Sequence, residues 1–197
     1  INTAAELINK AKKPLIVFGQ GVILGEAEQE FKHFVEKTGI PAAWTILGLS
    51  ALPTAHPLNV GMVGMHGNYG PNVLTNECDL LIAMGMRFDD RVTGDLNRYA
   101  KQAKIIHFEI DPAEVNKNVY ADVAVMGNIK STLPLVIEKV KNNHHEDWLK
   151  IFKEHDEIEY QKVIQKEIYP TKEQLTMGEV IHAINEETNG AVSYTHL

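Results

Sequence analysis

The sequence predicts an α/β fold in which a parallel sheet lies between two layers of helices. Short, unbroken apolar runs, such as residues 14–18 and 79–85, are typical of strands buried on both faces. Segments with apolar residues at helical spacing, such as residues 26–37, separate these runs. The alternation of strand and helix favours a three-layer parallel sheet. Ligands of such sheets bind beyond the carboxyl ends of the strands.

The expected elements follow one another at short intervals. Helices are expected over residues 2–11, 26–37 and 131–140, and strands over residues 14–18, 40–44, 79–85, 104–111 and 123–125. Asn2 and Thr3 can cap the first helix. Gly39 stands where a helix C-cap is expected. Asp111 and Pro112 predict the N-cap and first position of a further helix.

Three regions are predicted along the chain. Residues 1–142 form the α/β domain, and residues 143–175 are a charged linker of one or two helices that Pro170 ends. Residues 176–197 begin another α/β unit, in which Thr176 and Glu179 form a capping box. The chain begins without methionine and ends in a β-prone run, so both ends are expected to be cut. Residues 193–197 are expected to be foreign to the parent protein.

Composition excludes several function classes. A net charge of −7 disfavours non-specific nucleic-acid binding, which needs a cationic surface. The single cysteine, Cys78, can form neither an intrachain disulfide nor a cysteine metal site, and the histidines lack metal-ligand spacing, so no metal site is expected. No apolar run approaches the roughly 20 residues of a membrane span, and no signal segment is visible. We therefore expect a protein of a reducing compartment, the cytoplasm.

The most unusual segment is residues 85–94, which directly follow a strongly apolar strand. Arg87, Asp89, Asp90 and Arg91 are crowded between Gly85 and Gly94. On a solvated turn such charges would pair at little gain, about 0–1 kcal/mol. At the carboxyl end of a buried strand, a role in holding a ligand is favoured. Arginine presents a planar fork that suits phosphate or carboxylate.

Three other strand ends carry weaker signals. Residues 19–21 read Gly-Gln-Gly, but the next glycine comes one position late for a dinucleotide fingerprint. Glu109 ends a strand and is expected to be free to accept hydrogen bonds from a ribose. Residues 61–67 contain three glycines, which allow close approach to a ligand. Taken alone, this segment favours a plain loop with Met65 packed in the core, and His66 favours a structural role.

Together these segments resemble the central domain of acetolactate synthase, also called acetohydroxyacid synthase. The resembling parts are residues 14–21, 45–49, 56–58, 61–67, 79–94, 105–114 and 127–128, and they extend over residues 4–140. The run 87–94 is highly specific and is similar to the flavin-dependent biosynthetic enzymes. The resemblance implies a Rossmann-like domain that binds FAD, which has no net redox role in the reaction. It further implies that residues 176–197 begin the C-terminal thiamine-diphosphate domain.

The resemblance also implies site residues. The residues implied to line the FAD site are Gly19, Gln20, Gly21, Thr45, Ile46, Leu47, Gly64, Met65, His66, Gly67, Gly85, Arg87, Asp89, Arg91, Val92, Glu109, Ile110 and Asn128. Met65, Asp90 and Arg91 would also face the substrate channel, with Arg91 at the carboxylate of the second 2-oxoacid. Gln20 stands where the family usually has glycine, and Glu109 and Asn128 stand where it usually has aspartate. Each still presents a polar group.

For the whole enzyme, the resemblance implies condensation of two 2-oxoacids, pyruvate with pyruvate or 2-oxobutyrate, with loss of CO2 in branched-chain amino-acid biosynthesis. Thiamine diphosphate and Mg²⁺ do the carbon chemistry between two flanking domains, whose motifs are absent from this sequence. The fragment alone is therefore expected to be inactive. The implied partners are those flanking domains, further copies in a dimer or tetramer, and a regulatory small subunit.

Two alternatives remain open. Central domains of glyoxylate carboligase or pyruvate oxidase type share the sheet but not the full run 87–94. The other alternative is a stand-alone nucleotide-binding module. An initial methionine and a closed C-terminal strand would favour it, and this sequence has neither.

Overall fold

The structure of the protein is a computed structural model, and residues 1–170 and 175–188 are described. The chain divides into two compact units, Ile1–Lys153 and Glu154–Leu197. The strand and the foreign tail expected within residues 189–197 lie outside the described residues. The predicted boundaries after residues 142 and 175 stay predictions.

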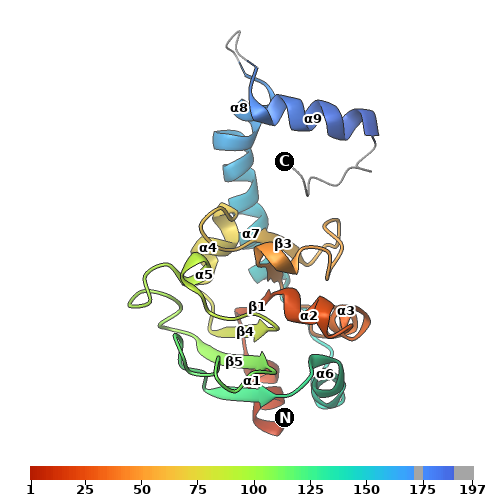
Figure 1. Ribbon diagram of the computed structural model, residues 1–197, viewed down its shortest axis with the longest axis vertical. Helices are drawn as coiled ribbons and strands as arrows, with labels where there is room; N and C mark the ends of the chain where they lie inside the picture. Colours follow the sequence, from red (N-terminus) through yellow and green to blue (C-terminus); the bar gives the residue numbers. More distant parts are fainter. Residues whose placement is uncertain (171–174, 189–197) are drawn as a thin grey trace. The chain divides into compact units, whose positions relative to one another are not determined.

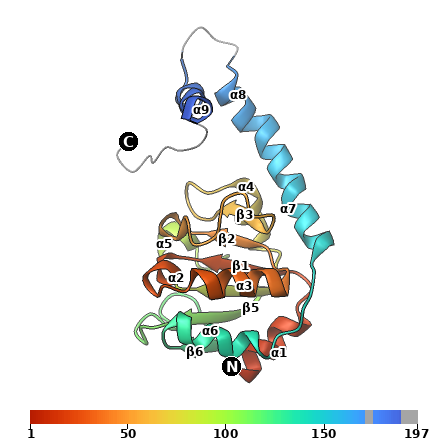
Figure 2. The ribbon, with the colours of Figure 1, turned by 90° about the vertical axis from the view of Figure 1, so that its right-hand side faces the viewer.

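The first unit is built on a six-stranded parallel sheet with the order β3-β2-β1-β4-β5-β6 (Figures 1 and 2). The strands are β1 (Pro14–Phe18), β2 (Ala42–Trp44), β3 (Asn59–Met62), β4 (Leu80–Met84), β5 (Lys104–Glu109) and β6 (Val123–Met126). The chain order reverses between β1 and β4, which pair in register from Pro14 with Leu80 to Phe18 with Met84. In open sheets of this kind, the crevice at such a reversal is the usual ligand site.

Helices cover both faces of this sheet. They are α1 (Asn2–Lys10), α2 (Gln20–Leu24), α3 (Glu28–Thr38), α4 (Tyr69–Leu74), α5 (Asp90–Thr93), α6 (Ile129–Ile137) and α7 (Glu146–Glu159), with a 3-10 turn, η1 (Ile46–Gly48). One core lies between the sheet and α1, α2, α3 and α6. The other core contains Leu74 of α4 and Trp148 and Phe152 of α7. The predicted three-layer α/β class is confirmed.

Most of the expected elements are present. All five predicted strands form, and Gly39 ends α3 with φ +62, as a C-cap glycine does. The edge strand β3 was not predicted, because its residues 59–62 run into the glycine-rich loop and lack an apolar pattern. The prediction that Asn2 and Thr3 cap the first helix is wrong, because both lie within α1. Ile1 precedes α1 and no side chain caps it.

The helix expected after Asp111 does not form. Asp111 Oδ1 instead accepts a hydrogen bond from the Ala113 amide at 2.8 Å, and the Asp111 carbonyl accepts one from the Glu114 amide at 3.2 Å. Asn116 then takes φ +61, a left-handed conformation that a helix cannot continue through. Aspartate makes such a turn as readily as it caps a helix, so the local signal did not decide between the two.

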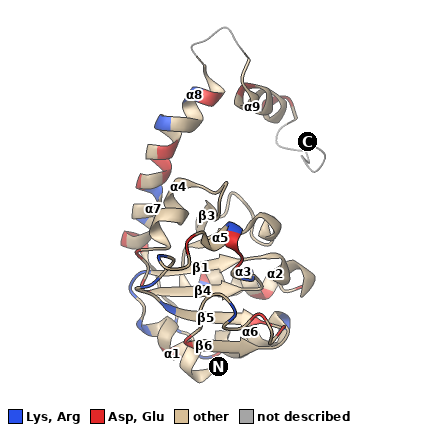
Figure 3. Cartoon of the chain, turned by 60° about the vertical axis from the view of Figure 1, so that its left-hand side comes forward, with Lys and Arg blue, Asp and Glu red and all other residues tan. Residues whose placement is uncertain are grey.

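The second unit consists of helical segments. It includes the last residues of α7, a π-helical turn η2 (Tyr160–Ile164), α8 (Gln165–Ile168) and α9 (Met177–Thr188). Both acidic and basic side chains lie along α7, as the charged composition predicts (Figure 3). The Glu179 amide donates to Thr176 Oγ1 at 3.1 Å, and the Thr176 amide donates to Glu179 Oε2 at 3.2 Å. The predicted capping box at α9 is confirmed.

The thiol of Cys78 lies inside the second core of the first unit. Its ionisation is expected to lower the stability of the fold at alkaline pH. Cys78 Sγ donates to the Thr75 carbonyl at 3.2 Å. Burial, with a smaller contribution from the charge of Asp79, raises the pKa of Cys78 from 9.0 to about 12. The folded state therefore keeps a proton that the unfolded state releases above about pH 9. The stabilising effect is complete below pH 9 and is lost as the pH rises toward 12.

We expect this group to make the free energy of unfolding fall as the pH rises from about 9 toward 12. Urea unfolding between pH 7 and pH 10.5, compared with Cys78→Ala, measures it. The variant should lose less stability with rising pH than the parent does. Equal slopes for the two proteins would contradict the assignment.

Candidate functional site

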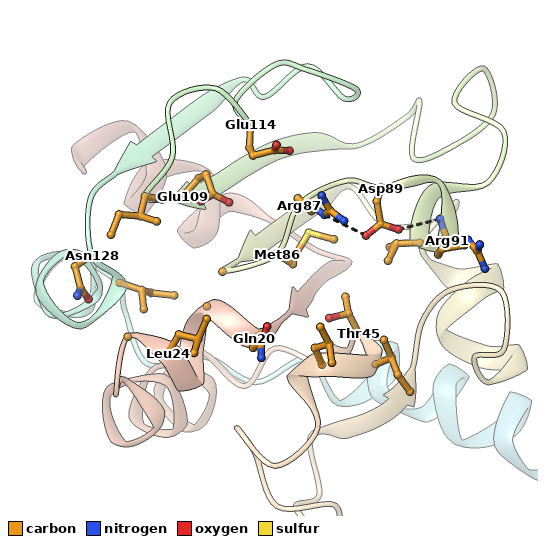
Figure 4. A pocket seen from close by; sticks show the side chains of 18 residues that line it. Gln20, Leu24, Thr45, Met86, Arg87, Asp89, Arg91, Glu109, Glu114 and Asn128 are labelled. Atoms are coloured by element: carbon orange, nitrogen blue, oxygen red, sulfur yellow. Dashed lines mark hydrogen bonds and ion pairs between the residues drawn. The ribbon is translucent and has the colours of Figure 1, made fainter. Parts of the chain in front are cut away.

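One cavity of about 500 Å³ opens at the carboxyl ends of the strands in the first unit (Figure 4). Its walls come from the segments that follow β1, β2, β4 and β5, and from the start of α6. The lining residues are Gln20, Gly21, Leu24, Gly25, Thr45, Ile46, Leu47, Gly85, Met86, Arg87, Asp89, Arg91, Val92, Glu109, Ile110, Glu114, Asn128 and Ile129. The sheet therefore brings together side chains that are up to 109 positions apart in the sequence, from Gln20 to Ile129.

Glycines allow the ends of β1 and β4 to touch beneath this cavity. The Gly21 amide donates to the Gly85 carbonyl at 2.8 Å, and Gly85 takes φ +58. A Cβ on Gly21 would lie 2.6 Å from the Gly85 Cα, closer than real Cβ contacts come. A Cβ on Gly19 would lie 2.6 Å from the Met86 Cβ, but Gly19 does not line the cavity. Gly-Gln-Gly thus lets two backbones meet at the crevice.

The arginine-rich segment forms one wall of the cavity. Asp89 uses one oxygen to cap α5, accepting from the Arg91 amide at 2.9 Å, while its other oxygen lies 3.7 Å from Arg87 Nε. Arg91 Nε lies 4.0 Å from Asp90, and both of these side chains are largely exposed. The Arg87 guanidinium therefore lies beside Asp89 and stays accessible, so its donors can meet an anionic ligand. The exposed pair of Arg91 and Asp90 contributes little to stability.

Glu109 and Asn128 stand at the opposite end from Arg91, and both are occupied by backbone amides (Figure 4). Glu109 Oε1 accepts from the amides of Ile110 at 2.8 Å and Asp111 at 3.1 Å. The expectation of a free Glu109 carboxylate therefore holds for Oε2 only, because Oε1 folds back on its own loop. Asn128 Oδ1 caps α6 by accepting from the Lys130 amide at 2.9 Å.

Apolar side chains at this cavity are left open to solvent. Leu24, Ile46, Leu47 and Ile110 are between 60% and 73% exposed. Such residues in one concave site are suited to cover the flat face of an aromatic ligand.

Sequence reasoning missed five of the lining residues, namely Leu24, Gly25, Met86, Glu114 and Ile129. Met86 lies inside a predicted segment. Leu24 is the last residue of α2, which begins within Gly-Gln-Gly, and Gly25 is its C-cap. Extending each strand-end motif by a few residues would have found them.

The glycine-rich segment 61–67 does not line the cavity, although it contacts one of its walls. The Met65 amide donates to the Arg91 carbonyl at 2.8 Å, and Gly64 lies against the same carbonyl. Met65 is 64% exposed, so the expectation that it packs in the core is wrong. Gly64, Met65, His66 and Gly67, together with Gly19, are the predicted cofactor residues that lie outside the cavity.

Within the residues that the structure describes, no helix has the length and apolar character needed to span a bilayer. Over residues 1–170 and 175–188, no group of three or more histidine, cysteine, aspartate or glutamate side chains is placed to hold a metal ion.

Comparisons with known proteins agree on one relationship. The profile of the family described as "Thiamine pyrophosphate enzyme, central domain" matches residues 1–136. An acetolactate synthase of Mycobacterium bovis is 44% identical over 73% of this chain and 23% of its own length. A probable acetolactate synthase large subunit of Methanocaldococcus jannaschii is 39% identical over 94% of this chain and 32% of its own. The acetolactate synthase isozyme 2 large subunit of Escherichia coli is 43% identical over 75% of this chain and 26% of its own length. The chain spans less than a third of each relative.

Proposed function

The chain belongs to the family of thiamine pyrophosphate enzyme central domains, and from this premise we propose that it is the FAD-binding central domain of an acetolactate synthase large subunit. The observation that carries the proposal is the cavity at the β1/β4 reversal. Apart from Gly19 and the four residues at 64–67, every residue proposed for the flavin site lines it. The names of the similar proteins support the choice of acetolactate synthase within the family.

The lining residues fit a flavin nucleotide by their chemistry. Arg87, beside Asp89, supplies a cationic fork for the pyrophosphate. The exposed apolar side chains of Leu24, Ile46, Leu47 and Ile110 suit the ring systems. Glu109 Oε2 and the Asn128 amide group are left to meet hydroxyls of the ligand. In the proposed reaction FAD undergoes no net redox change, so these residues bind and orient it.

The activity belongs to the longer protein. We propose that it joins two 2-oxoacids with loss of CO2, using thiamine diphosphate and Mg²⁺ held by flanking domains in the cytoplasm. Arg91 would bind the carboxylate of the second 2-oxoacid, beside Met65 and Asp90. We further propose a homo-oligomer of large subunits and a regulatory small subunit as its partners.

Titration of the chain with FAD, followed by flavin fluorescence and thermal unfolding, tests the cofactor. A ligand at a hundred times its Kd stabilises the native state by about 2.7 kcal/mol, so the melting temperature should rise with FAD. Arg87→Gln should weaken binding about tenfold, because it removes a charge-assisted contact. Arg98→Gln, a charge change at an exposed position outside the cavity, is the matched control and should bind like the parent.

No rise in melting temperature at millimolar FAD would contradict the cofactor proposal. Acetolactate production is measured separately by the colour assay for acetoin. The chain alone should give no signal above a blank, since the thiamine-binding motifs are outside this sequence. Product formation by the chain alone would contradict the division of roles.

A further inference from the structure

A buried histidine lies directly beneath the candidate site and is not one of its lining residues. His107 stands in β5 with its side chain fully buried. Its Nε2 lies 2.9 Å from the Met86 carbonyl oxygen and 3.5 Å from Glu109 Oε2. His107 and Glu109 are two positions apart on one strand, so their side chains share a face of the sheet. The ring therefore reaches the ends of both β4 and β5.

These neighbours determine which ring nitrogen carries the proton. The Met86 carbonyl oxygen can only accept, so Nε2 must donate to it. Nδ1 has no hydrogen-bond partner among the described residues. A buried polar atom without a partner costs stability, and a Val or Ile would fill this strand position without that cost. The contribution of the histidine must therefore come from Nε2.

The two atoms near Nε2 belong to the two polar walls of the cavity. Met86 precedes Arg87, and its carbonyl fixes the path of the chain as it leaves β4. The Phe88 ring packs edge-on against His107, with ring centroids 5.0 Å apart. Glu109 Oε1 is held by two backbone amides, so Oε2 is the oxygen left for a ligand. One buried N–H thus lies between the arginine wall and the carboxylate wall.

We propose that His107 is a positioning residue, whose Nε2–H donates to the Met86 carbonyl and holds the end of β4 beside the Glu109 carboxylate, and so sets the distance between the two polar walls of the nucleotide site. The ligand-dependent part of this assignment rests on the proposed FAD function. The structural part does not, because it concerns only the hydrogen bonds of the ligand-free chain.

Ligand-free NMR tests the structural part. Long-range ¹H–¹⁵N spectra of the imidazole should show His107 protonated at Nε2 only. Hydrogen exchange of the Ile110 and Asp111 amides should quicken in His107→Leu, because the carboxylate that holds them loses its neighbour. Ile105→Ala removes an apolar group from the same face of β5 and is the matched control, in which these amides should exchange as in the parent. A proton on Nδ1, or unchanged exchange in His107→Leu, overturns the proposal.

FAD affinity tests the functional part. We expect His107→Leu to raise the Kd about tenfold and His107→Gln, which keeps an N–H donor, to restore it to within about threefold. Ile105→Ala should lower the melting temperature without changing the Kd. A Kd in His107→Leu equal to that of the parent overturns the positioning role. If the parent itself binds no FAD, the flavin function fails, and the NMR results still decide whether His107 ties the two strands.

Discussion

Gly85→Ala is expected to damage both the fold and the site of this chain. Gly85 leaves β4 with φ +58, and a Cβ there would lie 2.7 Å from the Cα and carbonyl carbon of Gly21. Both obstacles are backbone atoms, so no side chain can move aside. Strained backbone costs about 1–3 kcal/mol and forced overpacking adds a similar amount, so we expect a loss of about 2–6 kcal/mol.

Gly94→Ala is the matched control, because Gly94 has nearly the same φ, +57, but no atom within 4 Å of an added Cβ. Its loss should be about 1–3 kcal/mol, from the backbone conformation alone, because φ +57 with ψ −125 suits glycine only. Urea unfolding of both variants measures the difference. FAD binding should be lost in Gly85→Ala, since the ends of β1 and β4 must separate beneath the cavity. Equal stabilities of the two variants would show that the contact of β1 with β4 is looser than the structure has it.

Sequence alone predicted the sheet because its strands differ chemically from the rest of the chain. Runs such as residues 14–18 and 80–84 are buried on both faces and therefore apolar throughout. Parallel order follows from the helices between them, and the position of a ligand site follows from parallel order. The edge strand β3 has no such signature, because only one neighbour pairs with it and its residues are partly exposed.

The errors at the candidate site have a common physical origin. The side chains involved accept hydrogen bonds from backbone amides one to five residues away, as those of Glu109, Asp111 and Asn116 do. Asn116 also has a left-handed backbone conformation. Several local arrangements satisfy such side chains almost equally well. The exposure of Met65, by contrast, depends on a contact with a residue far away in the sequence, because its loop packs against Arg91. His107 gave no sequence signal, because its role depends on β4 lying beside β5.

Trp148→Ala should cost the first unit about as much stability as Gly85→Ala, although Trp148 lies outside the cavity. The segment 143–169 is highly charged, yet the start of α7 lies within the second core. Trp148 is 3% exposed, and its Nε1 donates to the Pro14 carbonyl at 2.9 Å. Its ring meets Phe152 edge-on at 5.1 Å, and Lys13 Nζ lies 5.4 Å from its centroid. Removing a buried tryptophan costs about 3–5 kcal/mol.

Two further variants separate packing from hydrogen bonding at this position. Trp148→Phe keeps much of the ring but leaves the Pro14 carbonyl without its donor, which should cost about 1–3 kcal/mol. Lys153→Ala, at an exposed position of the same helix, should change stability by less than about 0.5 kcal/mol. Urea unfolding followed by far-ultraviolet circular dichroism, which does not need tryptophan as a reporter, measures the stability of all three variants. If Trp148→Ala unfolds at the same urea concentration as Lys153→Ala, α7 does not anchor β1. Because β1 supplies the Gly-Gln-Gly turn beneath the cavity, an anchoring role would make the start of this charged helix a structural support of the nucleotide site.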